Sequence, residues 1–285
     1  MAKLFIGTCS WKYDSWQGLV YSQQVSNYLA EYGQKYNSVE IDQWFWSLHQ
    51  AGQPILPQPS VVKEYCDSVP ADFIFTVKAP NSLTLTHYYQ KEKNKSLQEN
   101  PHFLSIDLYS RFLQALTAMH SRLGPILLQF EYLNKQKMAS QNELRTRLDQ
   151  FLQSCDRQLA IAVEIRNPNY LNRAWFDFLR QQGAAMVFLQ GYYMPPITEL
   201  YQKWGDQLQQ RAVIRLHGPD RKGMEEKSGN RWDRLLEPRD QELSAIAKMI
   251  ENLLRRELDV FVNVNNHYEG CAPLTIERLK KCLTL

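Results

Sequence analysis

Eight short apolar segments, each separated from the next by sequence with helical spacing, constrain the fold of this chain more than any other feature. Their apolar residues run almost without interruption, which is typical of parallel strands buried on both faces. The predicted strands are residues 4–10, 38–42, 73–79, 126–130, 159–165, 184–190, 212–217 and 259–265. Eight strand and helix units predict an α/β fold closed as a (β/α)8 TIM-type barrel, with residues 1–285 in a single domain.

The connecting segments predict helices at 25–36, 60–68, 101–123, 141–154, 173–182, 197–209, 240–256 and 273–282. The charged run QKEKNKSLQEN (90–100) is interpreted as a solvated loop, and residues 218–232 as a long polar loop. An open doubly wound sheet is the alternative fold. Neither a GxGxxG fingerprint nor a phosphate-binding P-loop follows a predicted strand, which favours the barrel.

Composition excludes several classes of protein. A net charge of +3 is too small to indicate nucleic-acid binding by itself, and 44% hydrophobic residues suffice for a sizeable core. Five cysteines without a CxxC pair indicate neither a disulfide framework nor a thiolate metal site. Because no run of 18 apolar residues and no export signal are evident, we expect a cytoplasmic protein without membrane association.

Polar side chains cluster at the carboxyl ends of the predicted strands, where the active site of a parallel barrel lies. In order they are Glu40 and Asp42, Lys78, Gln129, Glu164 and Arg166, Gln190, Arg215 and His217, then Asn263, Asn265 and His267. In strands five, seven and eight these residues alternate with apolar ones. If the apolar set faces the helices, the polar set points into the barrel mouth.

The charges in this set suit an anionic, phosphate-bearing ligand. Arg166 and Arg215 could grip a phosphate or carboxylate in bidentate fashion, and Lys78 adds a point charge. The predicted catalytic residues are Glu40 or Asp42 as base, with Glu164, and His217 as acid or base near neutral pH. The remaining predicted ligand-binding residues are Trp11, Asn263, Asn265 and His267. These roles predict a hydrolase or lyase.

A metal site is the less favoured interpretation, and no cofactor is predicted. Carboxylates and imidazoles that could ligate a divalent ion are present: Glu40, Asp42, Glu164, His217 and His267. Three carboxylates faced by three fixed cations nevertheless leave little negative charge to offset such an ion. No HxH or HExxH pair occurs either.

Two other functions stay open. Aromatic residues near the rim could stack on bases: Trp11, Tyr13, Trp16, Trp44, Phe45, Trp46, Tyr192, Tyr193 and Trp232. With Arg221, Lys222, Lys227 and Arg231 they could form a nucleic-acid-binding rim, although Asp220, Glu225 and Glu226 in the same loop weaken it. The third alternative is a structural or partner-binding barrel whose mouth is an ion-pair network, in which Glu164 and Arg166 merely pair.

Several motifs together resemble the YecE-like family, domain of unknown function 72. They are IGTCSWKYDSWQGLVY, NSVEIDQWFWSL, FTVKAPNSLT, ILLQF, AVEIRNPNYL, RLHGPDR and VNVNNHYEGCAPLTIERL. The resemblance implies a cytoplasmic TIM-type barrel without assigning a reaction, and its motif positions are Trp11, Glu40, Lys78, Glu164, Arg166, Arg215, His217, Asn265 and Asn266.

This chain departs from the family pattern at two places. Residues 42–46 replace the usual N-S-T-F-Y, and Gln190 replaces an acidic residue. A role common to all members is therefore not implied at Asp42 or Gln190. The barrel also resembles the xylose isomerase and endonuclease IV group of metal enzymes, but in fold alone, and their metal-ligand set is not evident here.

Overall fold

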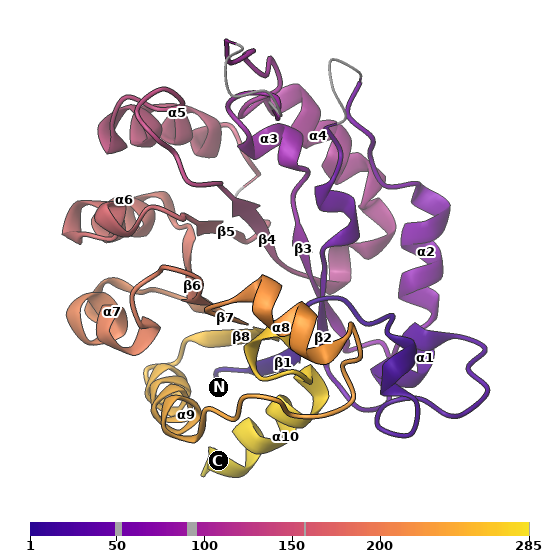
Figure 1. The fold of residues 1–285 in the computed structure, drawn as a ribbon. Coiled ribbons are helices and arrows are strands. Elements are labelled where there is room, and N and C mark those ends of the chain that lie inside the picture. The colour runs from indigo at the N-terminus through magenta and orange to yellow at the C-terminus, as the bar shows by residue number, and fades with distance from the viewer. Residues whose placement is uncertain (49–52, 90–95, 157, 285) are drawn as a thin grey trace.

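A computed structural model describes residues 1–48, 53–89, 96–156 and 158–284 of the chain. Eight parallel strands form a nearly closed TIM-type (β/α)8 barrel enclosed by helices, which confirms the predicted fold (Figure 1). The hydrogen-bonded order is β1-β8-β7-β6-β5-β4-β3-β2. The strands are β1 (Leu4–Thr8), β2 (Ser38–Ile41), β3 (Ile74–Lys78), β4 (Leu123–Gln129), β5 (Ile161–Glu164), β6 (Ala185–Gly191), β7 (Arg211–Gly218) and β8 (Asp259–Val264).

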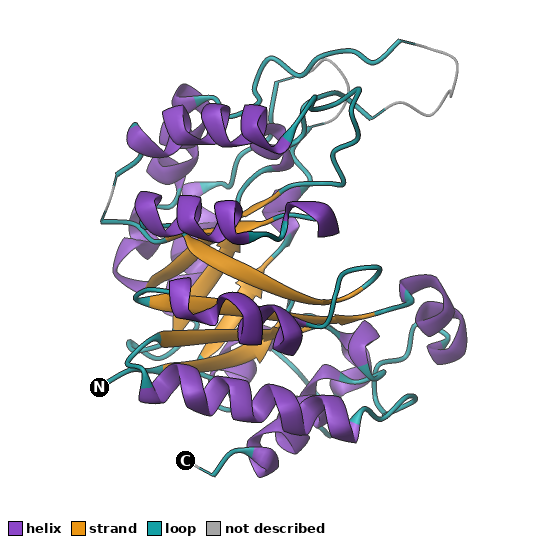
Figure 2. Ribbon diagram, turned by 90° about the vertical axis from the view of Figure 1, so that its left-hand side faces the viewer, coloured by secondary structure: helices purple, strands orange, loops and turns teal. Residues whose placement is uncertain are grey.

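Most of the α-helices pack along the outside of the strands (Figure 2). The α-helices of the described residues are α1 (Tyr28–Gly33), α2 (Pro59–Asp67), α3 (Asn81–Thr84), α4 (Ile106–Ala115), α5 (Gln141–Gln153), α6 (Arg173–Gln182), α7 (Ile197–Trp204), α8 (Arg221–Ser228), α9 (Asp240–Arg255) and α10 (Ala272–Cys282). Within the described ranges, no helix has the length and apolar character needed to cross a membrane.

Two of the predicted segments between strands differ from the structure, one in its limits and one in its type. The predicted helix 101–123 begins only at Ile106, because Leu104 has a left-handed backbone (φ 52°) and the Ser105 hydroxyl caps the helix by accepting from the Leu108 amide. Its last part, Thr117–Arg122, is a 3₁₀-helix. The predicted polar loop 218–232 contains helix α8, which the Asp220 carboxylate caps and Gly229 ends. Met224 is the single large apolar residue of this helix, so the sequence shows no hydrophobic period there and the pattern concealed the helix.

The predicted solvated loop 90–100 falls partly on residues 90–95, which lie outside the described residues. At its described end, His87 and Glu99 form an isolated antiparallel bridge. The Tyr88 amide also donates to the Gln98 carbonyl. The described flanks of this loop are therefore paired to each other.

Side chains close the barrel between β1 and β2, where the regular ladder is missing. The Tyr32 hydroxyl accepts from the Thr8 amide (2.8 Å) and donates to the Ser38 carbonyl (3.0 Å). The Asn37 amide group bonds both the Leu4 carbonyl and the Ile6 amide, at 2.9 Å each. The two bonds of the Tyr32 hydroxyl satisfy backbone groups that would otherwise be buried without partners.

Gly7 allows the two strands of this seam to approach. A Cβ atom at this position would lie 1.8 Å from the Ser38 carbonyl oxygen, so no other residue fits there without displacing the backbone. Nearer the carboxyl ends, the Ser10 amide bonds the Glu40 carbonyl at 2.9 Å. The closed seam thereby places the ends of β1 and β2 beside each other.

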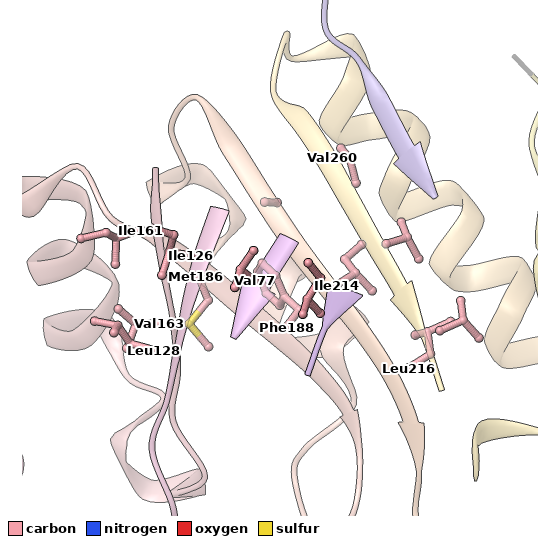
Figure 3. Close-up of a cluster of buried hydrophobic side chains, with 14 of the residues drawn as sticks. Val77, Ile126, Leu128, Ile161, Val163, Met186, Phe188, Ile214, Leu216 and Val260 are labelled. Atoms are coloured by element: carbon pink, nitrogen blue, oxygen red, sulfur yellow. The ribbon is translucent and has the colours of Figure 1, made fainter. Parts of the chain in front are cut away.

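The strands carry apolar residues on both faces at the amino-terminal half of the barrel. Outward-facing strand residues belong to one large buried cluster that also includes helix residues. Figure 3 shows part of it, with Val77, Ile126, Leu128, Val163, Ile214 and Leu216 among the labelled side chains. A separate inner cluster, here called the plug, fills the barrel and consists of Leu127, Ala162, Ala185, Val187, Val213 and Phe261. Since the plug seals the lower barrel, only the inward positions that follow it can line a site.

Candidate functional site

A polar layer lies directly above the plug. Because strand side chains alternate, residues two positions after a plug residue share its inward direction. The sequence relation is visible in four strands: Leu127 precedes Gln129, Ala162 precedes Glu164, Val213 precedes Arg215 and Phe261 precedes Asn263. All four polar residues are buried. The predicted inward orientation of the polar set holds for these strands.

Arg215 is the centre of this layer. Its Nε and Nη2 donate to the two carboxylate oxygens of Glu40 at 2.8 and 2.7 Å. Its Nη1 donates to Gln129 Oε1 at 3.0 Å and also to Glu164 Oε2. Arg215 is 1% exposed, and both glutamates are fully buried. Four strands are thus joined through one guanidinium group.

Charge pairing fixes the protonation of this layer. Burial alone would raise the pKa of Glu164, but the charges of Arg215 and Arg166 hold it at about 2. Burial would lower the pKa of Arg215, whereas Glu164 and Glu40 keep it well above its ordinary value. Glu164 and Arg215 are therefore charged at neutral pH, and most donors of Arg215 are already used. The predicted bidentate grip of Arg215 on a ligand does not fit this geometry.

A cavity of about 330 Å³ opens above the polar layer. Seven of the predicted site residues line it: Asp42, Lys78, Arg166, Arg215, His217, Asn265 and His267. Its other lining residues are Tyr13, Phe45, Trp46, Leu85, Tyr89, Gln129, Glu131, Tyr192 and Arg221. They extend from β1 to the segment after β8, so the cavity is the mouth of the barrel.

Arg166 presents a cation to this cavity. Its Nε donates to Glu164 Oε1 at 2.9 Å, which fixes the guanidinium plane. The group also lies over the Tyr192 ring, with its central carbon 5.0 Å from the ring centroid. No residue in the described ranges accepts a hydrogen bond from the terminal nitrogens of Arg166. Those nitrogens are the donors that a bound anion could use.

Lys78 and Asp42 occupy the side of the cavity near β2 and β3. Lys78 is 7% exposed, and its Nζ lies 3.8 Å from the centroid of the Phe45 ring. Burial, reinforced by Arg215, lowers the pKa of Lys78 to about 8, although Glu40 and Asp42 oppose the shift. Burial and the Glu40 charge raise the pKa of Asp42. Both groups thus titrate closer to neutrality than usual.

His217 is held between Cys9 and Tyr192. Its Nε2 lies 3.7 Å from Cys9 Sγ, and its Nδ1 lies 3.2 Å from the Tyr192 hydroxyl. Burial and the nearby charges of Arg215 and Arg166 lower the pKa of His217 well below its usual value. The imidazole is therefore neutral at pH 7. It can exchange hydrogen bonds with a ligand, but it carries no charge to attract one.

His267 lies at the outer edge of the cavity. Its Nδ1 bonds Asn265 Oδ1, and its Nε2 lies 3.2 Å from Glu225 Oε1 in α8. The Trp232 ring packs edge-on against the imidazole, with centroids 5.0 Å apart. Burial and Arg221 lower the pKa of His267. This arrangement connects the segment after β8 to helix α8.

Four predicted residues do not line the cavity. Glu40 and Glu164 lie in the layer beneath it, and Asn263 is buried there with its Oδ1 accepting from Thr76 Oγ1 at 3.3 Å. Trp11 is 6% exposed and packs edge-on against Tyr65. The Trp11 ring borders a different groove, so its predicted ligand role lacks support from the geometry.

Gln190, another of the polar strand ends, points outward. It accepts from the Ile197 amide at 2.9 Å and donates to Glu242 at 2.6 Å, so it anchors the start of α7 to α9. Beyond it, Gly191 approaches the backbone of Gly218 so closely that a Cβ atom would lie 2.3 Å from the Gly218 oxygen. This irregular pairing turns the chain and brings Tyr192 (φ 54°) to the cavity wall.

Sequence reasoning missed three residues that line the cavity, Leu85, Tyr89 and Glu131, and also Cys9, which contacts the cavity residue His217. Cys9 lies just after β1 and follows Gly7 by two positions, so the same period that indicated Glu164 and Arg215 could have indicated it. The other three belong to loops after β3 and β4, and Tyr89 pairs with Trp46 at a centroid distance of 6.2 Å. Loop contacts of this kind leave no periodic signal.

The chemistry of the donor set does not favour a metal ion. Glu40 and Glu164 already bind Arg215, and Asp42 is the carboxylate among the predicted ligands that reaches the cavity. In the described part of the chain, no group of three or more His, Cys, Asp or Glu side chains is arranged to hold a metal ion.

Comparison with known proteins identifies the family. The model of the protein family described as "Protein of unknown function DUF72" matches residues 5–285. A DUF72 family protein from Enterococcus faecalis V583 has a similar structure, with TM-score 0.71 and 19% identity over 99% of this chain and 96% of the other. One from Thermotoga maritima MSB8 has TM-score 0.68 and 22% identity over 98% of both chains. No curated protein matches the chain. The chain therefore belongs to the DUF72 family, whose YecE-like motifs its sequence carries.

Proposed function

We propose that the cavity binds a small phosphate-bearing ligand and that the protein is an acid-base enzyme, a hydrolase or lyase, acting on it. The observation that carries this proposal is the division of the cations into two layers. Arg215, at the base of the cavity, is neutralised by Glu40 and Glu164, whereas Arg166 and Lys78 face the cavity with donors that no residue in the described ranges accepts. Donors held in place before binding favour an anion because little ordering cost remains.

The geometry redistributes the predicted roles among the residues. Arg166 would bind the phosphate through its terminal nitrogens, and Lys78 would add a second positive charge. Asp42 suits the role of acid or base better than Glu40, because Asp42 lines the cavity and its pKa is raised. His217 and Tyr192 would orient the ligand as a neutral hydrogen-bonding pair.

Nucleic-acid binding is the second candidate, and exposed aromatic side chains favour it. Trp46, Tyr89, Tyr132 and Tyr193 are each at least half exposed, and the last two pair at a centroid distance of 6.3 Å. Such rings could stack on bases. The predicted basic loop supports this candidate poorly, because its cations pair with acids: Arg221 with Glu225, Lys222 with Glu226, Lys227 with Glu237, and Arg231 with Asp233.

Titration calorimetry with inorganic phosphate, adenosine monophosphate and a single-stranded oligonucleotide tests the proposal. Arg166→Gln should weaken phosphate binding by about 10- to 100-fold, since hydrogen bonds to charged groups contribute about 1.5–3 kcal/mol. Arg231→Gln is the matched control, because Arg231 is an exposed, paired arginine outside the cavity.

Equal phosphate affinity in the wild type and Arg166→Gln would refute the proposed site. If the oligonucleotide binds instead, with affinity that falls steeply as salt concentration rises, the second candidate is the correct one.

A further inference from the structure

Lys78 differs from the other lysines that contact aromatic rings. Lys12 and Lys280 lie 5.8 and 5.7 Å from the ring centroids of Tyr28 and Tyr36, and both are exposed. Lys78 lies closer to its ring, is buried, and ends strand β3 with its side chain in the cavity. It makes no ion pair or hydrogen bond with any residue in the described ranges. Its amine is therefore free to meet a ligand.

Burial, reinforced by the charge of Arg215, favours the neutral amine of Lys78. The carboxylates of Glu40 in β2, Asp42 just after β2 and Glu164 in β5 favour the ammonium form. Both glutamates are already paired with Arg215, which weakens their support. With a pKa of about 8, roughly a fifth of Lys78 is unprotonated at pH 7.4, whereas an ordinary lysine is about 0.1% unprotonated. Desolvation beside another cation is a recognised way to activate a lysine nucleophile.

We propose that Lys78 Nζ forms a covalent imine with an aldehyde or ketone that also carries a phosphate or carboxylate. The inference rests on the proposed function, because Arg166 would hold the anionic part while the carbonyl carbon meets Lys78. The substrate class of the cavity is then a small phosphorylated or carboxylated carbonyl compound. An iminium withdraws electrons from the adjacent carbon, as lyase chemistry requires.

The step balances without an added oxidant or reductant. The lone pair of the neutral amine attacks the carbonyl carbon, the C–N bond forms, and the carbonyl electron pair moves to oxygen. The nitrogen loses a proton, and the oxygen gains two protons in all and leaves as water, which yields a protonated imine. In sum, one ammonium group and one carbonyl group give one iminium group and one water. Asp42, with its raised pKa, can carry protons within the same cavity.

Reductive trapping tests the inference on the full-length protein. Limiting pyridoxal 5′-phosphate, an anionic aldehyde, is added with sodium cyanoborohydride, and the labelled lysines are identified by peptide mass mapping. Unphosphorylated pyridoxal is used in parallel. We expect Lys78 to be labelled at least 10-fold faster than Lys12 or Lys280. Lys78→Arg should abolish that label and keep the positive charge, whereas Lys12→Arg should leave Lys78 labelling unchanged.

The two probes separate the inference from the proposed function. Fast labelling of Lys78 by both aldehydes, with no advantage from the phosphate, supports imine formation and counts against the phosphate site. An advantage of the phosphorylated probe that Arg166→Gln removes supports both. If Lys78 in the wild type reacts no faster than Lys12 with either aldehyde, the inference is overturned. This last outcome needs no variant, so it stands even if Lys78→Arg fails to fold.

Discussion

Replacing Arg215 by methionine would remove the cation that joins the layer beneath the cavity. Methionine matches the unbranched stem of arginine as far as Nε, so the change removes the guanidinium charge and its four hydrogen bonds. Glu40 would then be a fully buried carboxylate without its partner, and Glu164 would keep Arg166 alone. Breaking a buried pair from one side costs about 3–5 kcal/mol, because the remaining charge is uncompensated.

The pH dependence of the free energy of unfolding gives a second signature. In the wild type, the folded pKa of Glu164, about 2, lies below its ordinary value of 4.5, so its contribution is present above pH 4.5 and is lost as the pH falls toward 2. That contribution is about 3 kcal/mol. Without Arg215, Glu164 should protonate more readily, because Arg215 is the largest of the charges that lower its pKa. The difference in free energy of unfolding between the wild type and Arg215→Met should therefore be smaller at pH 5 than at pH 8.

Urea unfolding followed by tryptophan fluorescence at pH 5 and pH 8 measures both effects. Lys63→Met is the control, because Lys63 forms a short ion pair with Asp67 (2.5 Å) that is mostly exposed. Such surface pairs contribute about 0–1 kcal/mol. A loss below about 1 kcal/mol for Arg215→Met at pH 8, or a deficit that grows at pH 5, would refute this reasoning.

Three further substitutions test separate features, each by urea unfolding. Lys78→Met should raise the free energy of unfolding at pH 7 by about 1–3 kcal/mol. The folded pKa of Lys78, about 8, lies below 10.5, so the buried charge destabilises the folded protein below pH 8 and this cost disappears as the pH rises from 8 to 10.5. A lower free energy of unfolding for the variant at pH 7 would contradict this. Gly7→Ala should lower the free energy of unfolding by more than about 3 kcal/mol, because the new Cβ is forced against the Ser38 carbonyl. Gly229→Ala, where a Cβ meets open space, should lower it by about 1 kcal/mol. Similar losses in the two variants would contradict the close approach of Gly7 to Ser38. Tyr32→Phe should lower the free energy of unfolding by about 1–3 kcal/mol, because two buried backbone groups lose a hydrogen-bond partner. An unchanged free energy of unfolding would show that the hydroxyl does not stabilise the contact between β1 and β2.

The fold could be predicted because its signals are local. Helix α5 illustrates this: the Ser140 hydroxyl accepts from the Glu143 amide, and the Glu143 carboxylate accepts from the Ala139 amide, as an S-x-x-E sequence indicates. The predicted range 141–154 differs from the observed helix by one residue. Local signals also explain why the prediction of a loop at α8 was wrong. The capping residue Asp220 and the i,i+4 ion pairs of this helix are polar residues, and a run of polar residues also indicates a loop.

The sequence predicts which side chains point into the barrel, but not the level along the barrel axis at which each one lies. The period of two residues correctly turned Glu164, Arg166, Arg215 and His217 inward. It could not tell which of them would meet at one level, because that depends on the register between strands. Irregular pairing in the β3–β4 and β6–β7 ladders shifts this register, and no local pattern records such shifts.

Depth decides which charges are available to a ligand. Along the ladder, Gln129 pairs with Glu164, and Arg215 pairs with Asn263, which places these residues in one closed layer. The inward residues two positions further on, Arg166 after Glu164 and His217 after Arg215, line the cavity above Arg215 and Gln129, which border it from below. Two arginines of the same sequence pattern therefore differ in their contacts: Arg215 is fixed by buried carboxylates, and the terminal nitrogens of Arg166 have no acceptor in the described part of the chain. A substitution at the lower level should change stability first, whereas one at the upper level should change binding first.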